Sequence, residues 1–233
     1  MKRNYIIIFV LLIIFFIGLF LSTQINKKEG FSNTDIGIDK VIYINLDKRT
    51  DRKEQIEGEL QKMGITEYER FPAIANKNGA LGCSKSHLEI IKLAKQNGYK
   101  NVLVLEDDFQ FIVDKDVFYE EIDNLSKTPY DACLLAYNTP NYYDSPYPFL
   151  HRIKDAQTTS AYIVNSHYYD TLINQWEKAV KMFEQTDDAT KYTCDQSWKP
   201  LQEKDDWYCF KKRIGVQRES YSDIQMGVVN PNV

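Results

Sequence analysis

The sequence lacks an excess of positive charge. Its 233 residues include 29 lysines and arginines and 33 aspartates and glutamates, which gives a net charge of −4. Residues 1–28 hold four of the basic residues and no acidic one, so the remainder has 25 basic and 33 acidic residues, a balance of about −8. Nucleic-acid binding needs a basic surface, so this balance argues against a nucleic-acid partner. It still permits one local basic pocket for a nucleotide.

Cysteine is also scarce, and there is no internal repeat or low-complexity tract. The four cysteines are Cys83, Cys133, Cys194 and Cys209, and their spacing matches no zinc-binding pattern. Cys133 lies in an apolar run and is expected to be a buried free thiol. Cys194 and Cys209 could pair if the domain faces an oxidising compartment, which the sequence does not decide.

The first residues are predicted to anchor the chain in a membrane. Lys2 and Arg3 precede an apolar segment from Tyr5 to Leu21, about the minimum length for a membrane-spanning helix. No convincing small-residue cleavage site follows, so we predict an uncleaved signal anchor, with a cleaved signal peptide as the alternative. The positive-inside rule places residues 1–4 in the cytoplasm and the rest of the chain in a lumen or outside the cytoplasm.

One folded domain is expected after this anchor. The anchor covers residues 5–22, and the polar residues 23–39 are predicted to form a stem. Residues 40–230 suffice for one domain of ordinary size with a full core. Predicted strands alternate with helices from residue 41 to about 183, which indicates an α/β sheet with helices on both faces. Residues 139–150 and 185–207 are expected to be mostly loop.

The most informative segment is Asn101–Asp108, where a run of valine and leucine ends in Glu106, Asp107 and Asp108. The run is typical of a buried parallel strand, and open α/β sheets bind ligands at the carboxyl ends of such strands. Side chains alternate along a strand, which would direct Glu106 and Asp108 to the same side. Two carboxylates there would form a site for Mn²⁺ or Mg²⁺ that holds a diphosphate. Alternatively, these acids only cap the next turn and lie in solvent.

A second polar segment follows the first predicted strand of the domain. It contains Asn45, Asp47, Arg49 and Arg52 and leads into a predicted helix. Arginine binds phosphate through paired hydrogen bonds, and Asp47 can accept a hydrogen bond from a ribose hydroxyl or a base. The alternative is a solvated charged turn that caps the helix.

Gly79–Gly82 is expected to form a turn, and Ser84 or Ser86 to begin the next helix. Ser86 and His87 would then lie in a first helical turn, where free backbone N–H groups bind anions. Tyr137 and Asn138 end another buried strand. An aromatic ring there could pack on a sugar, although such rings more often fill cores.

Two late acidic residues, Asp195 and Asp223, are candidates for a general base that deprotonates a hydroxyl nucleophile. Isolated acids in polar loops are more often simply solvated, so neither is chosen by its local sequence alone.

The order of these segments resembles glycosyltransferase family 25, which contains lipooligosaccharide β-galactosyltransferases and procollagen galactosyltransferases. The matching pieces are Val41–Arg52, Gly79–Leu88 and Asn101–Asp108, with weaker matches at Ser160–Val164 and Ser222–Ile224. Together they span nearly all of the sequence after the predicted stem. The resemblance implies a GT-A-type α/β/α sandwich with a mostly parallel sheet, a UDP-sugar donor and inversion at the anomeric carbon.

The resemblance also implies a divalent ion at a DxD-like motif. In this chain the motif is Glu106-Asp-Asp108, with glutamate at its first position. Carried over by position, Asp47, Arg49 and Arg52 would lie near the nucleotide. Asp108 would be the main metal ligand, assisted by Glu106 or Asp107, and Asp195 is favoured over Asp223 as the base.

Three functions are therefore compared. The first is transfer of a hexose, galactose or glucose, from a UDP-sugar to a hydroxyl on a glycan or protein. The second is a non-catalytic domain of the same fold that binds a glycan or partner, suggested by Glu106 and by the absence of a motif that identifies the base. The third is a metal-dependent phosphohydrolase, which would have no need of Arg49 and Arg52.

Overall fold

A computed structural model describes residues 37–222 and 227–229 of the chain. Residues 1–36, which include the predicted anchor and most of the predicted stem, lie outside this range, so those assignments stay predictions. Among the described residues, no helix is both long and apolar enough to cross a membrane. Ile38 is already buried in the core, and the Asp39 N–H donates to Asn101 Oδ1 at 2.9 Å, so the fold begins before residue 40.

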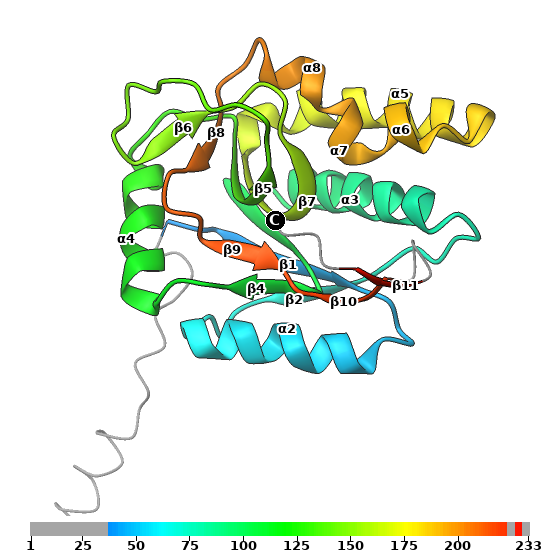
Figure 1. The fold of residues 1–233 in the computed structure, drawn as a ribbon, viewed down its shortest axis with the longest axis horizontal. Helices are drawn as coiled ribbons and strands as arrows, with labels where there is room; N and C mark the ends of the chain where they lie inside the picture. The colour runs from blue at the N-terminus through cyan, green and yellow to red at the C-terminus, as the bar shows by residue number, and fades with distance from the viewer. Residues whose placement is uncertain (1–36, 223–226, 230–233) are drawn as a thin grey trace, which may run out of the picture. The chain divides into compact units, whose positions relative to one another are not determined.

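Strands and helices alternate through the first two-thirds of this region, as predicted (Figure 1). The elements in chain order are β1 (Lys40–Asn45), α2 (Thr50–Met63), β2 (Glu69–Pro72), α3 (Gly79–Gln96), β3 (Asn101–Glu106), β4 (Phe109–Phe111), α4 (Lys115–Ser126), β5 (Ala132–Asn138), β6 (Leu150–Arg152), β7 (Gln157–Asn165), η2 (Ser166–Tyr168), α5 (Tyr169–Thr186), α6 (Ala189–Tyr192), α7 (Cys194–Ser197), α8 (Lys199–Gln202), β8 (Trp207–Phe210), β9 (Gly215–Gln217), β10 (Ser220–Ser222) and β11 (Gly227–Val229). The segment after α5, predicted to be mostly loop, contains three short helices before β8.

The main sheet is mixed but mostly parallel. Its strand order is β2-β1-β3-β7-β5-β8-β6. Strands β2, β1, β3, β5 and β8 run in one direction, whereas β7 and β6 are antiparallel to their neighbours. Strand β7 lies between β3 and β5 and is antiparallel to both. Its first residues therefore lie at the edge of the sheet at which β3 and β5 end. This edge is the place where open α/β sheets bind their ligands.

Two hydrophobic layers cover the sheet, as expected for an α/β/α sandwich. Val41 and Tyr43 of β1 face the layer that contains the buried side chains of α2 and α4. Ile42 and Ile44 face the opposite layer, which contains those of α3 and α5. Figure 1 shows α3 and α5 lying side by side, and they make many contacts. Each fully buried aliphatic side chain among them, such as Val41 and Ile42, contributes about 1.5–3 kcal/mol to folding through removal of apolar surface from water.

Helix α3 begins at Gly79, which corrects the predicted turn at Gly79–Gly82. Asn78 is the N-cap, and its side-chain oxygen accepts from Leu81 N at 3.1 Å. Gly82 is required by close packing instead, since a Cβ atom there would lie 2.5 Å from the Ile74 carbonyl oxygen. Glycine was therefore misleading as a turn signal, because a tight helix–loop contact selects it as well.

We expect Gly82→Ala to destabilise the protein by about 1–3 kcal/mol, because the added methyl group would displace the Ile74 backbone. Gly58→Ala is the matched control, since Gly58 lies in helix α2 with no atom near the added methyl group. The control should raise stability by about 0.5–1 kcal/mol through helix propensity. Chemical unfolding followed by tryptophan fluorescence measures both. Equal effects of the two substitutions would contradict the packing explanation.

Candidate functional site

The carboxyl ends of β1 and β3 bring two of the predicted polar segments together. Asn45 Nδ2 donates to Asp107 Oδ2 at 2.8 Å. Arg52, in the first turns of α2, donates from one nitrogen to Asp107 Oδ1 at 3.0 Å and to Asp108 Oδ2 at 3.1 Å. Gln217, the last residue of β9, also donates to Asp108 Oδ2 at 3.1 Å. Residues more than a hundred positions apart in the chain thus meet at one sheet edge.

Strand β3 ends at Glu106, so alternation along one strand does not fix where Asp108 points, and the predicted pairing of Glu106 with Asp108 around a metal ion stays a prediction. Asp107 and Asp108 lie in the following turn and share Arg52. The Oε1 atom of Glu106 contacts His87 Nε2 at 3.1 Å and accepts a hydrogen bond from Thr159 Oγ1 at 2.7 Å. The adjacent carboxylates that converge are therefore Asp107 and Asp108.

Asp108 offers an oxygen suited to a cation. Its Oδ1 atom is buried and has no hydrogen-bond partner among the described residues. Burial, followed by the charge of Glu106, raises the pKa of Asp108 to about 7, and burial also raises the pKa of Asp107. A divalent ion would satisfy this oxygen and stabilise the ionised carboxylates. The residues present therefore fit the predicted Mn²⁺ or Mg²⁺.

The shift at Asp108 predicts a pH-dependent stability in the presence of a chelator. The pKa of Asp108 is higher in the folded protein than in the unfolded chain. Its contribution to the free energy of unfolding is therefore greatest at low pH and is lost as pH rises towards 7. Asp108→Asn cannot lose a proton, so its stability relative to the natural protein should rise between pH 4 and 7, by at most about 1.4 kcal/mol per pH unit. Urea unfolding across this range measures the difference. The exposed Asp116 provides a control, Asp116→Asn, which should show no such trend.

Glu106 behaves differently from its neighbours because it pairs with His87. Burial opposes its ionisation, but the hydrogen bond and charge of His87 outweigh burial and lower the pKa of Glu106. His87 is fully buried, and its Nδ1 contacts the Tyr162 hydroxyl at 2.8 Å. Burial would lower the pKa of His87, but Cys194 and Glu106 raise it. An ionised glutamate is thereby held between the sheet and α3.

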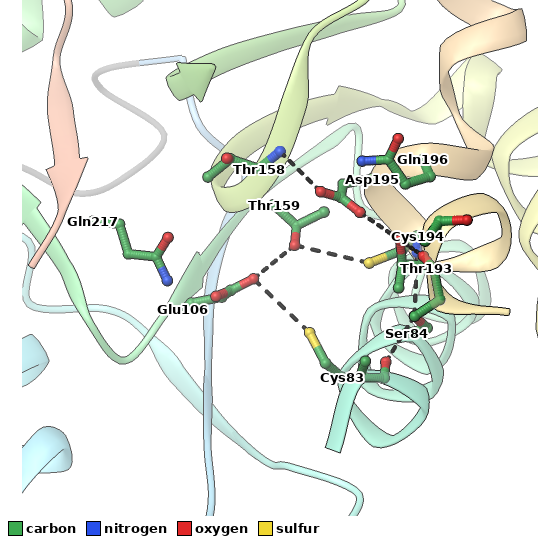
Figure 2. Close-up of a pocket in the computed structure, with 13 residues that line it drawn as sticks. Cys83, Ser84, Glu106, Thr158, Thr159, Thr193, Cys194, Asp195, Gln196 and Gln217 are labelled. Carbon is green, nitrogen blue, oxygen red and sulfur yellow. Dashed lines mark hydrogen bonds between the residues drawn. The ribbon is translucent and has the colours of Figure 1, made fainter. Parts of the chain in front are cut away.

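Two cavities meet at this edge. We call the first the arginine cavity; it has a volume of about 230 Å³, and its polar lining includes Asn45, Lys48, Arg49, Arg52, Asp107 and Asp108. The second, the threonine cavity, has a volume of about 490 Å³, and its polar lining includes Thr158, Thr159, Thr190, Thr193, Asp195 and Gln196 (Figure 2). Cys83, Glu106 and Gln217 line both cavities. The arrangement can hold two ligands on either side of these shared residues.

The arginine cavity combines positive and negative groups. Arg49 lines it and makes two hydrogen bonds to Asp51, at 2.9 and 2.8 Å. These bonds lower the pKa of Asp51 to about 2. Gly79, at the positive N-terminal end of α3, lines the same cavity. Asp47 does not line it; its side chain is 83% exposed and pairs with Arg70.

Ser86 and His87 are not in a first helical turn, because α3 starts seven residues before Ser86. The Ser86 hydroxyl donates to the Gly82 carbonyl at 2.8 Å and accepts from the Ile74 N–H at 2.8 Å, which ties α3 to the preceding loop. Neither residue lines either of the two cavities. His87 reaches the site through its contact with Glu106.

Tyr137 and Asn138 also lie away from both cavities. Tyr137 is buried, its hydroxyl donates to the Phe210 carbonyl at 2.7 Å, and Arg213 stacks over its ring at 4.6 Å. Asn138 is exposed at the end of β5. The aromatic ring therefore serves the core, which was the more common of the two uses considered.

Asp195 lies in the threonine cavity, held from two directions. Its Oδ1 accepts from the Thr193 hydroxyl at 2.7 Å, and its Oδ2 accepts from the Thr158 N–H at 3.3 Å (Figure 2). Thr158 has φ +86°, a strained backbone for a β-branched residue. Such strain costs of order 1–3 kcal/mol and concentrates at functional sites. Asp223, the other candidate base, lies outside the described residues.

Packing on α3 and α5 positions the helix that carries Asp195. Trp176 Nε1 donates to the Cys194 carbonyl at 3.0 Å, and Cys194 N donates to Ser84 Oγ at 3.1 Å. The cavity residues missed from the sequence include Thr158, Thr159 and Gln217. Thr159 precedes the strand motif at Ser160, so its position at a strand start was the available signal. No local signal marked Gln217.

The chain is similar in sequence to proteins named as glycosyltransferases. It is 33% identical over 126 residues to a protein of Acanthamoeba polyphaga mimivirus that is named a glycosyltransferase. It is 29% identical over 104 residues to a glycosyltransferase 25 family member of Drosophila melanogaster, and 27% identical over 106 residues to one of Drosophila pseudoobscura. The chain is a relative of glycosyltransferases, with family 25 members among them.

These alignments are partial. They cover 44%, 33% and 34% of this chain, and only 38%, 17% and 17% of the three relatives in the same order. No protein-family model matches the chain. Its acceptor, donor and metal are therefore matters for proposal.

Solved structures give a weaker likeness. A glycosyltransferase involved in glycosylation of the major capsid of PBCV-1 aligns with a TM-score of 0.48 at 10% identity, over 80% of this chain and 95% of that one. The glycosyltransferase GlyE of Streptococcus pneumoniae aligns with a TM-score of 0.40 at 14% identity, over 74% of this chain and 38% of that one. Similarity of this degree supports no functional conclusion.

Proposed function

We propose that this chain transfers galactose or glucose from a UDP-sugar to a hydroxyl group of a glycan or protein, with inversion at the anomeric carbon and with a divalent metal ion. The observation that carries the proposal is the meeting of two cavities at Glu106, with paired carboxylates on one side and Asp195 on the other. Transfer between two substrates needs two adjoining sites of different chemistry.

The arginine cavity suits the UDP diphosphate. Arg49 and Arg52 supply guanidinium groups that bind phosphate oxygens, and the N-terminal end of α3 at Gly79 adds a favourable dipole. Asn45 orients Asp107 through its amide. A divalent ion held by Asp108 and Asp107, beside Glu106, would supply Lewis-acid neutralisation of the departing diphosphate. The chain's own part is to hold these carboxylates in position with Arg52 and Gln217.

The threonine cavity suits the acceptor. Asp195 takes the proton from the acceptor hydroxyl, whose oxygen forms a bond to the anomeric carbon from the face opposite the diphosphate. The bond between that carbon and the phosphate oxygen breaks, and its electron pair leaves with UDP. Thr158 and Thr193 hold the Asp195 carboxylate, so it is oriented before the acceptor arrives.

A donor screen tests the proposal directly. The purified full chain is incubated with UDP-galactose, UDP-glucose and UDP-N-acetylglucosamine, and released UDP is measured with Mn²⁺, with Mg²⁺ and with a chelator. We expect release from one of the first two donors, loss of release with chelator, and recovery when metal is restored. UDP binding by calorimetry without any turnover would favour the non-catalytic alternative. Hydrolysis of simple phosphate esters instead would favour a phosphohydrolase.

A further inference from the structure

Three soft metal ligands converge beside the proposed active site. Cys83 and His87 lie one turn apart on α3, and Cys194 is the first residue of α7. One ligand atom from each of them lies within 4.8 Å of the other two. We propose that Cys83, His87 and Cys194 bind a zinc ion, in a site separate from the carboxylates Asp107 and Asp108.

The chemistry of the ligands selects zinc over manganese or magnesium. Two thiolates and an imidazole are soft and borderline ligands, which favour Zn²⁺, whereas Mn²⁺ and Mg²⁺ prefer carboxylate and water oxygens. In a tetrahedral site with Zn–S near 2.3 Å and Zn–N near 2.1 Å, neighbouring ligand atoms lie about 3.4–3.8 Å apart. The present spacing is compatible with that geometry after side-chain shifts of about 1 Å or less.

Glu106 completes the set of four. Its Oε1 lies 3.1 Å from His87 Nε2 and 4.0 Å from Cys83 Sγ, so this oxygen faces the same space as the imidazole and the thiol. Thr159 donates to the same oxygen at 2.7 Å and fixes its direction. Figure 2 shows the sulfur atoms of Cys83 and Cys194 directed towards Glu106 and Thr159.

The surrounding contacts match those of a metal-bound histidine. Such a histidine usually donates its second ring N–H to an oxygen, which sets its tautomer and ring orientation. His87 Nδ1 contacts the buried Tyr162 hydroxyl at 2.8 Å, which leaves Nε2 for the metal. Cys194 is held against α3 through Ser84 and against α5 through Trp176, so the ligands are brought together by the fold itself.

The position of these ligands gives a metal ion a route to them and determines what a bound ion would do. Cys83, Cys194 and Glu106 line the threonine cavity, which gives an ion a route to them. A bound ion would join α3, β3 and α7 directly beside Asp195. It would act as a structural clamp on that wall of the cavity.

Metal binding is tested without reference to sugar transfer. The reduced, chelator-treated full chain is titrated with Co²⁺, and thiolate-to-cobalt charge-transfer absorption is recorded before displacement by Zn²⁺. We expect one equivalent of metal, and an affinity at least about 10²-fold weaker in Cys83→Ser and Cys194→Ser, each of which removes a thiolate ligand. Cys133→Ser and Cys209→Ser are matched controls, because these two thiols are buried elsewhere in the sheet and should leave the titration unchanged.

Several outcomes would overturn the zinc site. One is absence of the charge-transfer band in the folded natural chain. Another is its persistence when Cys83 and Cys194 are replaced together. Loss of two titratable thiols without metal, reversed by a reductant, would identify a disulfide between these residues instead. Near-ultraviolet circular dichroism checks that each variant folds, and His87→Gln offers a second route if a serine variant does not.

The proposal of a zinc site and the proposed function can be disproved independently of each other. Asp108→Asn should lose Mn²⁺-dependent UDP release yet keep the cobalt band. Cys83→Ser should weaken cobalt binding whether or not the chain transfers sugar.

Discussion

Replacing Asp108 by asparagine is expected to lower UDP release from the preferred donor by about 10²–10³-fold, the usual cost of losing one group that stabilises transition-state charge. Asparagine keeps the shape of the side chain and an oxygen for Arg52 and Gln217. It removes the negative charge and replaces one carboxylate oxygen by an amide nitrogen, so a divalent ion loses its best ligand. The effect should appear in kcat and in the Mn²⁺ concentration needed for half-maximal rate.

Asp116→Asn is the control for this substitution, since Asp116 is exposed on α4 and lines neither cavity. Its kinetic constants should match those of the natural chain. An Asp108→Asn variant with unchanged rate and metal dependence would remove the carboxylate pair from the mechanism.

Replacing Asp195 by asparagine is expected to lower kcat by about 10²–10⁴-fold, the usual contribution of a general base, with little change in the KM for the donor. The side chain can still accept a hydrogen bond from Thr193 or Thr158, so the local structure should persist. The measurement is the rate of transfer as a function of pH. In the variant, the rise in rate with pH that reports deprotonation of the base should disappear.

Asp223→Asn separates the two candidate bases. If Asp195→Asn retains nearly full activity while Asp223→Asn loses it, the base is Asp223. Glu203→Gln, a change of an exposed acid just after α8, controls for loss of negative charge in this region and should be neutral.

The elements predicted most accurately were those whose pattern depends on local sequence. Strands β1, β3 and β5 are buried apolar runs, and the end of α2 at Gly64 is confirmed by its left-handed backbone, with φ +74°. Sequence alone could not give the direction of β7, because a strand buried on both faces has the same pattern whether it runs parallel or antiparallel.

The segments that form the site could be predicted from the sequence, but most contacts between their side chains could not. Asp107 and Asp108 meet Arg52 because β1 and β3 are neighbours, which the order of motifs indicated. Strand alternation could not relate Glu106 to Asp108, because β3 ends at Glu106 and Asp108 lies in the turn that follows. Ser84 and Cys194 are 110 residues apart, and no local pattern indicates their contact. It depends on buried tryptophans that dock α7, which is a tertiary effect.

The reversed strand β7 also affects how such a protein can diversify. Because β7 runs against its neighbours, the segment before it, residues 139–156, which includes β6, leads into β7 at the edge where both cavities open. Insertions or deletions in that segment would reshape the wall formed by Thr158 and Thr159 while leaving the pairing of β1 with β3 intact. On the proposed function, changes in the loop before β6 would alter acceptor preference, while the groups proposed to bind the nucleotide stay unaltered.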